Sequence, residues 1–407
     1  MPKVKKGSAG KKGDKVRSDC FVEIELTNSG GIQSTLISKV DSMYGESIND
    51  LIIMMCEFFE IKNAKIHLDD YGALPFTIAA RLEAAYKKVN PADEREFLPK
   101  MNKNNLYKTT REKIRRSRLY LPGNEPKFYP NAGLHKPDGI ILDLEDSVAP
   151  SDKESARFLV RNALRSVDFY GAERMVRINQ IPLGLEDLKY IVPHNVHLIL
   201  IPKCESAETV LEVDEAIKNI CAEKKIKENI FYMPIIESAL GVENAYRIAS
   251  ASENVCALAI GLEDYTADIG VVKTNKGTES FYARSAVVNA AKAAGVQAID
   301  SVFADVEDMN ALRESVLEAK SLGFEGKGCI HPRQIKIVHE AFAPDEADIE
   351  KAKKIVAAFN EAKKNGSGVV ALGSKMIDAP VVKRALHVIE RAIQNNLLKK
   401  NWHKNLK

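Results

Sequence analysis

The sequence contains no long hydrophobic run and no closely paired cysteines. None of its stretches approaches the ~18 consecutive apolar residues that a membrane-spanning helix needs, and its first residues lack the apolar core of a signal peptide. We therefore expect a cytoplasmic protein with no membrane partner. The six cysteines are scattered without a C-x-x-C pair, which argues against a zinc site and against a disulfide framework.

The chain also lacks an excess of charge of either sign. Its 59 Lys and Arg against 56 Asp and Glu leave a formal net charge of +3, which is too balanced for the basic field of a nucleic-acid-binding protein. A hydrophobic content of 45% argues against a disordered chain. Because single cores stop growing at roughly 250 to 300 residues, the 407 residues are expected to form two unequal domains.

The first part of the chain predicts a flexible tail followed by a small α+β domain. Residues 1–20 are rich in Lys, Arg and Gly, a composition typical of a flexible basic tail. In VEIEL, from Val22, apolar residues alternate with glutamates, as in a strand with one solvent-exposed face. The helical patterns SINDLIIMMCEFFEI and TIAARLEAAYKKV, with a second alternating run between them, complete a domain over residues 21–89.

A repeated strand and helix pattern follows the polar segment 90–113, which predicts a linker. Eight short apolar runs, from RLYLPG to KGCIHP, alternate with amphipathic helical stretches. Eight such units predict an α/β fold, a closed (β/α)8 TIM barrel, over residues 114–345. Residues 346–407 are predicted to form a C-terminal helical extension.

Polar residues stand at the end of each predicted strand, and in a barrel these ends meet on one face, where active sites are built. Glu237 and Asp264 offer the oxygen ligands that Mg²⁺ prefers. Arg177 offers a planar cation for a carboxylate or a developing enolate oxygen. Glu145 and Asp146 are predicted to bond metal-bound waters. Any one of these residues alone could equally be a strand-end cap or a structural ion pair, but together they indicate a site.

Three further strand-end residues remain open to a structural interpretation. Asp143 is consistent with a purely structural role, and His331 with a residue that orients the loop after the eighth strand. Lys203 could neutralise a phosphate or carboxylate, or pair with Glu205.

The strings RRSRLYLPGN, GIILDLEDSV, VRIN, IPKCES, PIIESALG, IGLEDY, GFEGKGCIHPRQI and GSKMIDAPVVKRA resemble the HpcH/HpaI aldolase superfamily, which includes the citrate lyase beta subunit and the malyl-CoA and citramalyl-CoA lyases. The resemblance covers about Arg115 to Ala385. It implies Mg²⁺ on Glu237 and Asp264, and catalysis by Arg177. It also implies a keto-acid carboxylate held by the backbone of Leu262, Glu263 and Asp264.

The same resemblance assigns roles to two residues outside the strand ends. Asp378, in the M-I-D motif of the C-terminal extension, would come from a neighbouring subunit of a trimer and act as the acid/base at the enolate carbon. Spacing alone favours a helix N-cap for Asp378, since a proline stands in the first helical turn. Arg116 would meet the phosphates of a CoA-type arm.

The N-terminal domain has a resemblance of its own. FVEIEL, YGESINDLI and IHLDDYGALPFTIAARLEAAYKK resemble the citrate lyase gamma subunit, an acyl carrier protein. In that subunit a serine before the first strand carries a phosphoribosyl-dephospho-CoA arm, and Ser18 stands at the matching place. The context VRSDCF departs from the family's E-S-G-D, so an ordinary loop serine is the alternative, with Ser8 as a weaker attachment site.

The two resemblances together imply a Mg²⁺-dependent carbon-carbon lyase. It would cleave a 3-hydroxy-3-carboxy acyl thioester of the citryl, citramalyl or malyl type to a keto acid and an acyl thioester, as a homotrimer or larger assembly with an acyl-carrier transferase subunit as a further partner. One alternative is a lyase acting on free CoA thioesters, with the N-terminal domain as an assembly module. The other is a non-catalytic carrier or scaffold, against which the intact Arg177, Glu237, Asp264 and Asp378 argue.

Overall fold

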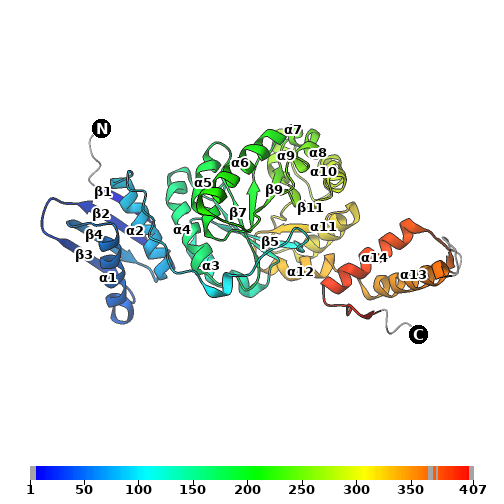
Figure 1. Ribbon diagram of the computed structural model, residues 1–407, viewed down its shortest axis with the longest axis horizontal. Helices are drawn as coiled ribbons and strands as arrows, with labels where there is room; N and C mark the ends of the chain where they lie inside the picture. Colours follow the sequence, from blue (N-terminus) through cyan, green and yellow to red (C-terminus); the bar gives the residue numbers. More distant parts are fainter. Residues whose placement is uncertain (1–5, 365–369, 373–374, 403–407) are drawn as a thin grey trace.

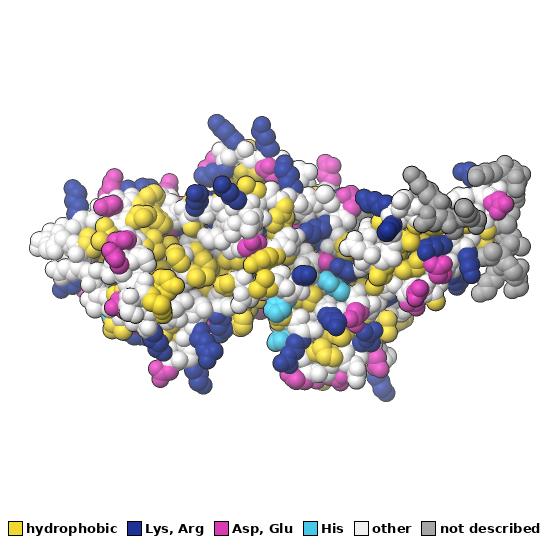
Figure 2. Space-filling view, turned by 90° about the horizontal axis from the view of Figure 1, so that it is seen from below, with side chains coloured by type: hydrophobic (Ala, Val, Ile, Leu, Met, Phe, Trp, Pro, Cys, Tyr) yellow, Lys and Arg dark blue, Asp and Glu magenta, His cyan; other side chains and the backbone are white. Residues whose placement is uncertain are grey.

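The computed structural model describes residues 6–364, 370–372 and 375–402, and arranges them in three parts along an elongated molecule (Figure 1). A small α+β domain lies at one end, a closed barrel occupies the centre, and a helical hairpin lies at the other end. Basic and acidic side chains are interspersed over the face seen in Figure 2. Among the described helices, none is long and apolar enough to cross a membrane.

The N-terminal domain is a four-stranded sheet packed against two helices. The strand order is β1-β2-β4-β3, and only the pair of β3 and β4 is parallel. The apolar residues of VEIEL, Val22 and Ile24, are buried, as the period of two predicts. The elements are β1 (Lys6–Gly10), β2 (Cys20–Leu26), β3 (Ile32–Ser38), α1 (Asp41–Phe58), β4 (Ala64–Asp70) and α2 (Pro75–Val89).

The prediction of a flexible tail over residues 1–20 is wrong from Lys6 onward, because residues 6–10 form β1 and pair with β2. Composition suggested a tail, yet the strand is stabilised by its tertiary neighbours. Lys6 forms an ion pair with Glu23 on the adjacent strand. The small side chains of KGSAG allow a close approach to α2, since a methyl group on Gly7 would overlap the carbonyl oxygen of Ala85. Residues 1–5 lie outside the described residues.

The segment between the two domains lies against the barrel and holds one short helix, η1 (Lys103–Asn105). Asn105 is buried, and its side-chain amide donates to the carbonyl of Val167. The N-terminal domain itself docks through α2, where Glu83 forms an ion pair with Arg161 of α4 (Lys153–Ser166). Both side chains are fully buried, so this ion pair ties the two domains together.

Eight parallel strands close into a barrel, as the eight apolar runs predicted. Its interior is filled by apolar side chains such as Ile141, Leu200 and Met233. The strands are β5 (Ser117–Pro122), β6 (Gly139–Asp143), β7 (Glu173–Arg177), β8 (Leu198–Ile201), β9 (Phe231–Ile236), β10 (Ala257–Ile260), β11 (Gln297–Asp300) and β12 (Gly326–Cys329). The main helices around it are α4 (Lys153–Ser166), α5 (Leu183–Ile191), α6 (Ala207–Lys224), α10 (Phe281–Ala294), α11 (Met309–Leu322) and α12 (Arg333–Phe342).

Shorter helices occupy the loops of the barrel. Those at its carboxyl end include α9, which begins directly after Gly261. The set comprises η2 (Pro126–Phe128), α3 (Tyr129–Ala132), η3 (Gly133–His135), η4 (Pro150–Asp152), η5 (Val192–His194), α7 (Ala239–Glu243), α8 (Ala245–Ala249), α9 (Leu262–Asp268) and η6 (Thr278–Ser280).

The C-terminal extension is a helical hairpin that projects from the barrel (Figure 1). Its elements are α13 (Glu346–Lys364), β13 (Val370–Leu372), β14 (Lys375–Ile377) and α14 (Ala379–Gln394). A small separate core that includes Val356 and Ile389 joins α13 to α14. The far end of α14 returns to the amino end of the barrel, where Arg391 lies 3.8 Å from Glu325.

Candidate active site

A cavity of about 460 Å³ opens at the carboxyl end of the barrel, where the predicted strand-end residues meet. Arg177 is the last residue of β7, Glu237 follows β9, and Asp264 lies in the first turn of α9 after β10. All three line the cavity, together with Asp143, Asp146, Leu262 and Glu263. Parallel strands bring these side chains from distant points of the chain to one place.

Arg177 is held rigidly by carboxylates from the neighbouring strand end. Its Nε and Nη2 donate to the two oxygens of Asp143 at 2.6 and 2.8 Å, and its Nη1 lies 2.9 Å from Glu145. Burial acts to lower the pKa of Arg177, but the hydrogen bonds that it donates to Asp143 outweigh burial and raise the pKa above its ordinary value. Asp143 therefore orients the guanidinium, which stays charged at every working pH.

Glu237 is a buried carboxylate in a constrained position. It is 6% exposed, and its Oε2 accepts a hydrogen bond of 2.8 Å from the backbone N–H of Lys203. Its other oxygen packs against Gly261, where any added methyl group would overlap the carboxylate. Burial raises the pKa of Glu237 to about 7, although the Lys203 hydrogen bond and the Arg177 charge both act in the opposite direction.

Lys203 has a larger part in this site than the sequence indicated. Its ammonium lies 3.4 Å from Glu145, 3.7 Å from Asp146 and 3.6 Å from Asp264. It does not pair with Glu205, which accepts instead from the hydroxyl of Ser238 at 2.6 Å. Burial acts to lower the pKa of Lys203, but the surrounding carboxylates outweigh it and raise the pKa. The ammonium thus bridges the acidic residues at the mouth of the cavity.

The carboxylates fit a hard divalent cation that keeps part of its shell for substrate and water. No group of three or more His, Cys, Asp and Glu side chains could hold a metal on its own within the described ranges. Mg²⁺ is commonly bound through one or two carboxylates plus ligand and water oxygens, and Glu237 and Asp264 supply such a pair. Their oxygen donors, on adjacent strand ends of one cavity, fit Mg²⁺.

Glu145 and Asp146 form ion pairs with basic side chains in this structure. Besides Arg177, the pair approaches Lys203, and Glu145 accepts from the side chain of Gln180 at 3.2 Å. Burial raises the pKa of Glu145. Burial also acts to raise the pKa of Asp146, but the hydrogen bond between the Asp146 and Glu145 side chains and the charges of Arg177 and Lys203 outweigh it and lower that pKa. Their predicted bonds to metal-bound waters stay a prediction.

The backbone after β10 offers hydrogen-bond donors to the cavity. The N–H groups in the first turn of α9 have no intrahelical acceptor. That of Leu262 donates to the hydroxyl of Ser301 at 3.1 Å. The N–H groups of Glu263 and Asp264 follow it in the same turn. The side chain of Glu263 forms an ion pair with Lys273, at 2.7 Å from its ammonium, so the predicted hold on the keto-acid carboxylate would fall to the backbone.

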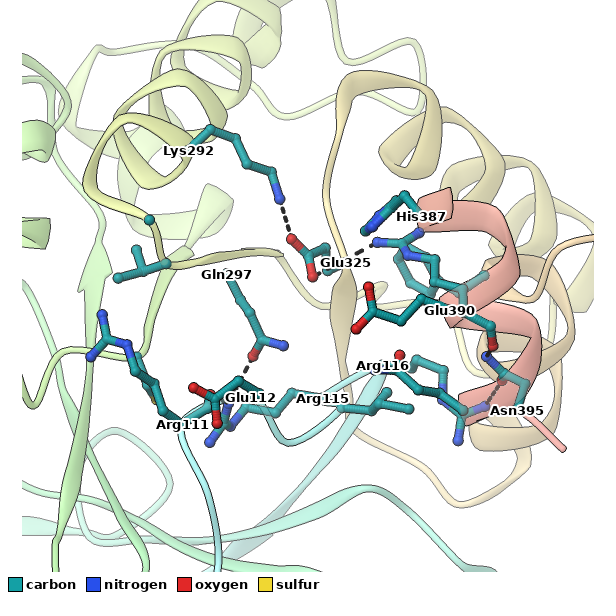
Figure 3. A pocket seen from close by; sticks show the side chains of 17 residues that line it. Arg111, Glu112, Arg115, Arg116, Lys292, Gln297, Glu325, His387, Glu390 and Asn395 are labelled. Carbon is teal, nitrogen blue, oxygen red and sulfur yellow. Dashed lines mark hydrogen bonds and ion pairs between the residues drawn. The ribbon is translucent and has the colours of Figure 1, made fainter. Parts of the chain in front are cut away.

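Arg116 does not line this cavity, and its predicted contact with the phosphates of a CoA-type arm stays a prediction. Arg116 stands directly before β5, at the amino end of the barrel, because opposite ends of a strand lie on opposite faces. Its guanidinium bonds both oxygens of Asp138, each at 2.8 Å, and the side chain of Asn395. There it lines a different cavity of about 320 Å³, between α14 and the barrel, in which Lys292 pairs with Glu325 (Figure 3).

Asp378 does not line the cavity of its own chain. It is the N-cap of α14, where its carboxylate accepts from the N–H of Val381 at 3.1 Å. The hairpin that carries it projects away from the barrel (Figure 1). The N-cap geometry is what the spacing of the M-I-D-A-P string indicated, and an acid/base role requires the cavity of another chain.

Ser18 lies in the loop between β1 and β2, close to the barrel rim. Its backbone is left-handed, with φ of 54°, and its N–H donates to the carbonyl of Tyr71 at 2.9 Å. The next residue, Asp19, forms a buried ion pair with Arg81, and Arg81 also donates to the carbonyl of Asn124 at 3.3 Å. Asn124 follows the carboxyl end of β5, so this loop borders the face that carries the cavity.

Sequence reasoning missed Arg118, which lines the same cavity from within β5. The sequence spacing could have indicated Arg118, because residues two apart on a strand share a face. Tyr120 and Pro122, two and four residues further along β5, line the cavity too. His331 accepts a hydrogen bond from the N–H of Arg333 at 3.2 Å, which fits its predicted role in orienting the loop after β12.

Comparisons with known proteins agree with this architecture. The model of the HpcH/HpaI aldolase/citrate lyase family matches residues 116–332, and the acyl carrier family described as malonate decarboxylase delta subunit (MdcD) matches residues 11–89. Citrate lyase subunit beta of Haemophilus influenzae is 41% identical over 285 residues, which are 69% of this chain and 97% of the relative. Mitochondrial citramalyl-CoA lyase of Homo sapiens is 32% identical over 290 residues, 68% of this chain and 85% of the relative.

A solved structure extends the agreement to the fold. Protein CitE from Mycobacterium tuberculosis, in complex with magnesium, acetoacetate and coenzyme A, is 28% identical. The match covers 70% of this chain and 99% of that one, with a TM-score of 0.58. Both resemblances drawn from the sequence, and the TIM-barrel prediction, are confirmed.

Proposed function

The chain belongs to the HpcH/HpaI aldolase/citrate lyase family, and we propose that it cleaves a 3-hydroxy-3-carboxy acyl thioester to a keto acid and an acyl thioester with Mg²⁺ at Glu237 and Asp264. Like its relatives, it is a lyase. The observation that carries the proposal is one cavity that joins two carboxylates to the rigidly held Arg177. The magnesium in the CitE complex supports the choice of metal.

Each group around the substrate has a distinct task. When bound, Mg²⁺ supplies a Lewis acid that lowers the pKa of the substrate hydroxyl. Arg177, kept charged by Asp143, donates to the oxygen on which negative charge develops, a contribution of about 3 to 4 kcal/mol by analogy with oxyanion holes. The backbone N–H groups of Glu263 and Asp264 receive the keto-acid carboxylate.

The bond changes balance without a further reactant. The substrate hydroxyl loses its proton to solvent, and its carbon becomes the carbonyl carbon of the keto acid. The electron pair of the breaking carbon-carbon bond passes to the α-carbon of the thioester and forms an enolate. Asp378 of a neighbouring chain delivers a proton to that carbon. This step makes the active form an oligomer, a homotrimer by resemblance.

We further propose that Ser18 carries the acyl group on a phosphoribosyl-dephospho-CoA arm. The contact of Arg81 with Asn124 and the ion pair of Lys11 with Glu125 hold the Ser18 loop beside the rim of the barrel. An arm attached there would start close to the cavity of its own chain. An acyl-carrier transferase would then load the arm. One observation supports the alternative, a lyase for free CoA thioesters, because the CitE complex contains coenzyme A.

The lyase is tested with purified protein and citryl-CoA, citramalyl-CoA and malyl-CoA as substrates. We expect keto-acid release that stops with EDTA and returns with Mg²⁺. Glu237→Ala should abolish this Mg²⁺-dependent release, whereas Glu186→Ala, which removes an exposed carboxylate paired with Lys189, should leave it unchanged. Mg²⁺-dependent cleavage by Glu237→Ala at the wild-type rate would show that the metal is assigned to the wrong residue.

The carrier role is tested by the intact mass of the protein purified from its native host, with peptide mapping. We expect a mass increment of the prosthetic arm on the peptide that contains Ser18, lost in Ser18→Ala and kept in the control Ser8→Ala. An unmodified chain that cleaves free CoA thioesters would instead establish the alternative, with the N-terminal domain as an assembly module.

A further inference from the structure

Arg118 places a guanidinium inside the barrel, at the base of the cavity. It is the second residue of β5 and is 1% exposed, yet it lines the cavity together with Tyr120 and Glu237. Its Nη1 lies 3.1 Å from the sulfur of Met233, a residue of the barrel interior. The side chain therefore points inward, below the carboxylates of the rim.

No carboxylate neutralises this guanidinium anywhere in the described part of the chain. Its Nη2 donates only to the backbone carbonyl of Asp300 at 3.3 Å, and its Nε has no hydrogen-bond partner. The Asp300 carboxylate is occupied by Lys327 at 2.7 Å and Arg284 at 3.1 Å. An arginine remains protonated in proteins, and a buried charge without a counter-ion is strongly unfavourable.

Most of the other deeply buried arginines form an ion pair with a carboxylate of the protein. Arg81, Arg115 and Arg161 form ion pairs with Asp19, Glu173 and Glu83. Arg174 lacks a carboxylate, but it bonds the backbone carbonyl and the side chain of Asn195, and it does not line this cavity. Arg118 is thus distinguished by facing the cavity with an unpaired donor, so its counter-ion would be the ligand.

We propose that Arg118 binds a second carboxylate of the substrate and makes the enzyme selective for citryl thioesters, an inference that rests on the proposed lyase function. The citryl group carries a carboxymethyl substituent where citramalyl has a methyl group and malyl has a hydrogen. Cleavage leaves that substituent on the keto acid, which becomes oxaloacetate rather than pyruvate or glyoxylate.

The shape and chemistry of the cavity support this orientation. Glu237 and Asp264 would hold the metal that binds the substrate hydroxyl, and the backbone of α9 would hold the first carboxylate, both at the rim. A third substituent on the same carbon then extends inward past Tyr120 toward Arg118. The walls there include the apolar side chains of Ile235 and Ala259. A methyl group in this place would leave the buried cation unpaired, and sites of this kind reject such analogues strongly.

The inference is tested by the kcat/KM of the wild type and of Arg118→Met with citryl-CoA and with citramalyl-CoA. We expect the wild type to prefer citryl by ~10³-fold or more. Arg118→Met should lose most of the citryl activity while citramalyl cleavage is maintained, and Arg118→Lys should lie between. The matched control is Arg174→Met, which removes another buried arginine without a carboxylate partner and should leave the substrate ratio unchanged.

The outcomes separate this inference from the proposed function. A wild type that cleaves citramalyl-CoA as well as or better than citryl-CoA keeps the lyase and overturns the role of Arg118. A folded Arg118→Met that loses both activities equally also overturns it, because the arginine is then structural. A wild type that cleaves no thioester with Mg²⁺ removes the proposed function itself.

A second measurement needs no variant. With Mg²⁺ present, oxaloacetate should raise the melting temperature of the wild type more than the same concentration of pyruvate does, because only oxaloacetate brings a second carboxylate to Arg118. Equal shifts from the two keto acids would contradict the inference even if Arg118→Met failed to fold.

Discussion

The buried carboxylate of Glu237 lowers the stability of the metal-free protein, but the same negative charge is needed to bind a cation. We predict that Glu237→Gln stabilises the metal-free protein at pH 8. Glutamine has nearly the same shape, and its amide oxygen can still accept the hydrogen bond from the N–H of Lys203. The substitution therefore removes a buried charge while the packing against Gly261 is retained.

The magnitude and the sign follow from the raised pKa of Glu237. The difference between a pKa of about 7 in the folded state and the ordinary 4.5 corresponds to about 3.5 kcal/mol, at about 1.4 kcal/mol for each tenfold change in proton affinity. Because the folded state binds this proton more tightly, the contribution of Glu237 to stability falls as the pH rises from 4.5 to 7. Above pH 7 the whole penalty is present, and below 4.5 it vanishes.

The affinity for Mg²⁺ should rise with pH over the range in which the stability of the metal-free protein falls. Mg²⁺ needs the ionised carboxylate, so protons compete with it below pH 7. The apparent Mg²⁺ affinity of the wild type should fall by about tenfold for each pH unit below 7 and level off above it. Added Mg²⁺ should stabilise the wild type at pH 8 and leave Glu237→Gln unchanged.

The assay is urea unfolding followed by circular dichroism between pH 4.5 and 8, with EDTA or with Mg²⁺, and isothermal titration gives the Mg²⁺ affinity. Glu186→Gln, at an exposed position, is the control that should change neither quantity. The reasoning is refuted if metal-free Glu237→Gln is no more stable than the wild type at pH 8. It is equally refuted if the Mg²⁺ affinity is the same at pH 6 and pH 8.

Two further substitutions test the geometry around the site. Asp378→Asn should keep the N-cap of α14, and with it the melting temperature, because Asn also caps helices. It should lower kcat by ~10² to 10⁴ because Asn cannot transfer the proton. Asp378→Ala should in addition lose about 1 kcal/mol of stability. Mixed oligomers of Asp378→Asn and Glu237→Ala chains should regain activity, and no recovery would argue that the aspartate does not come from a neighbour. Gly261→Ala should push the Glu237 carboxylate aside and weaken Mg²⁺ binding by about 10- to 100-fold, and unchanged binding in a calorimetric titration would contradict the tight packing.

The strand ends of the barrel were predictable because their positions follow from local patterns. A run of apolar residues that ends in a polar one marks the carboxyl end of a buried strand, and all such ends meet on one face of a barrel. This rule brings Arg177, Glu237 and Asp264 together from the sequence alone, and all three line one cavity. Arg116 stood at the start of such a run, and the same rule puts it on the opposite face, where the structure has it.

Other features escaped prediction because they depend on neighbours far away in the sequence. The strand β1 looks like a basic tail, and it is ordered by pairing with β2 and by close packing on α2. Lys203 lies in an ordinary strand-end string, yet its ammonium meets three carboxylates that come from two other loops.

The amino-acid sequence by itself determined the two-domain organisation, the closed barrel and the acidic strand ends, since hydrophobic periodicity and strand-end residues are local properties of the chain. Only the tertiary structure decided which charges are compensated. Arg118 is one basic residue among 59 in the sequence. In the fold it is a buried cation that faces the cavity without a carboxylate partner among the described residues, because the ionic partners of a side chain depend on which distant strands and loops surround it.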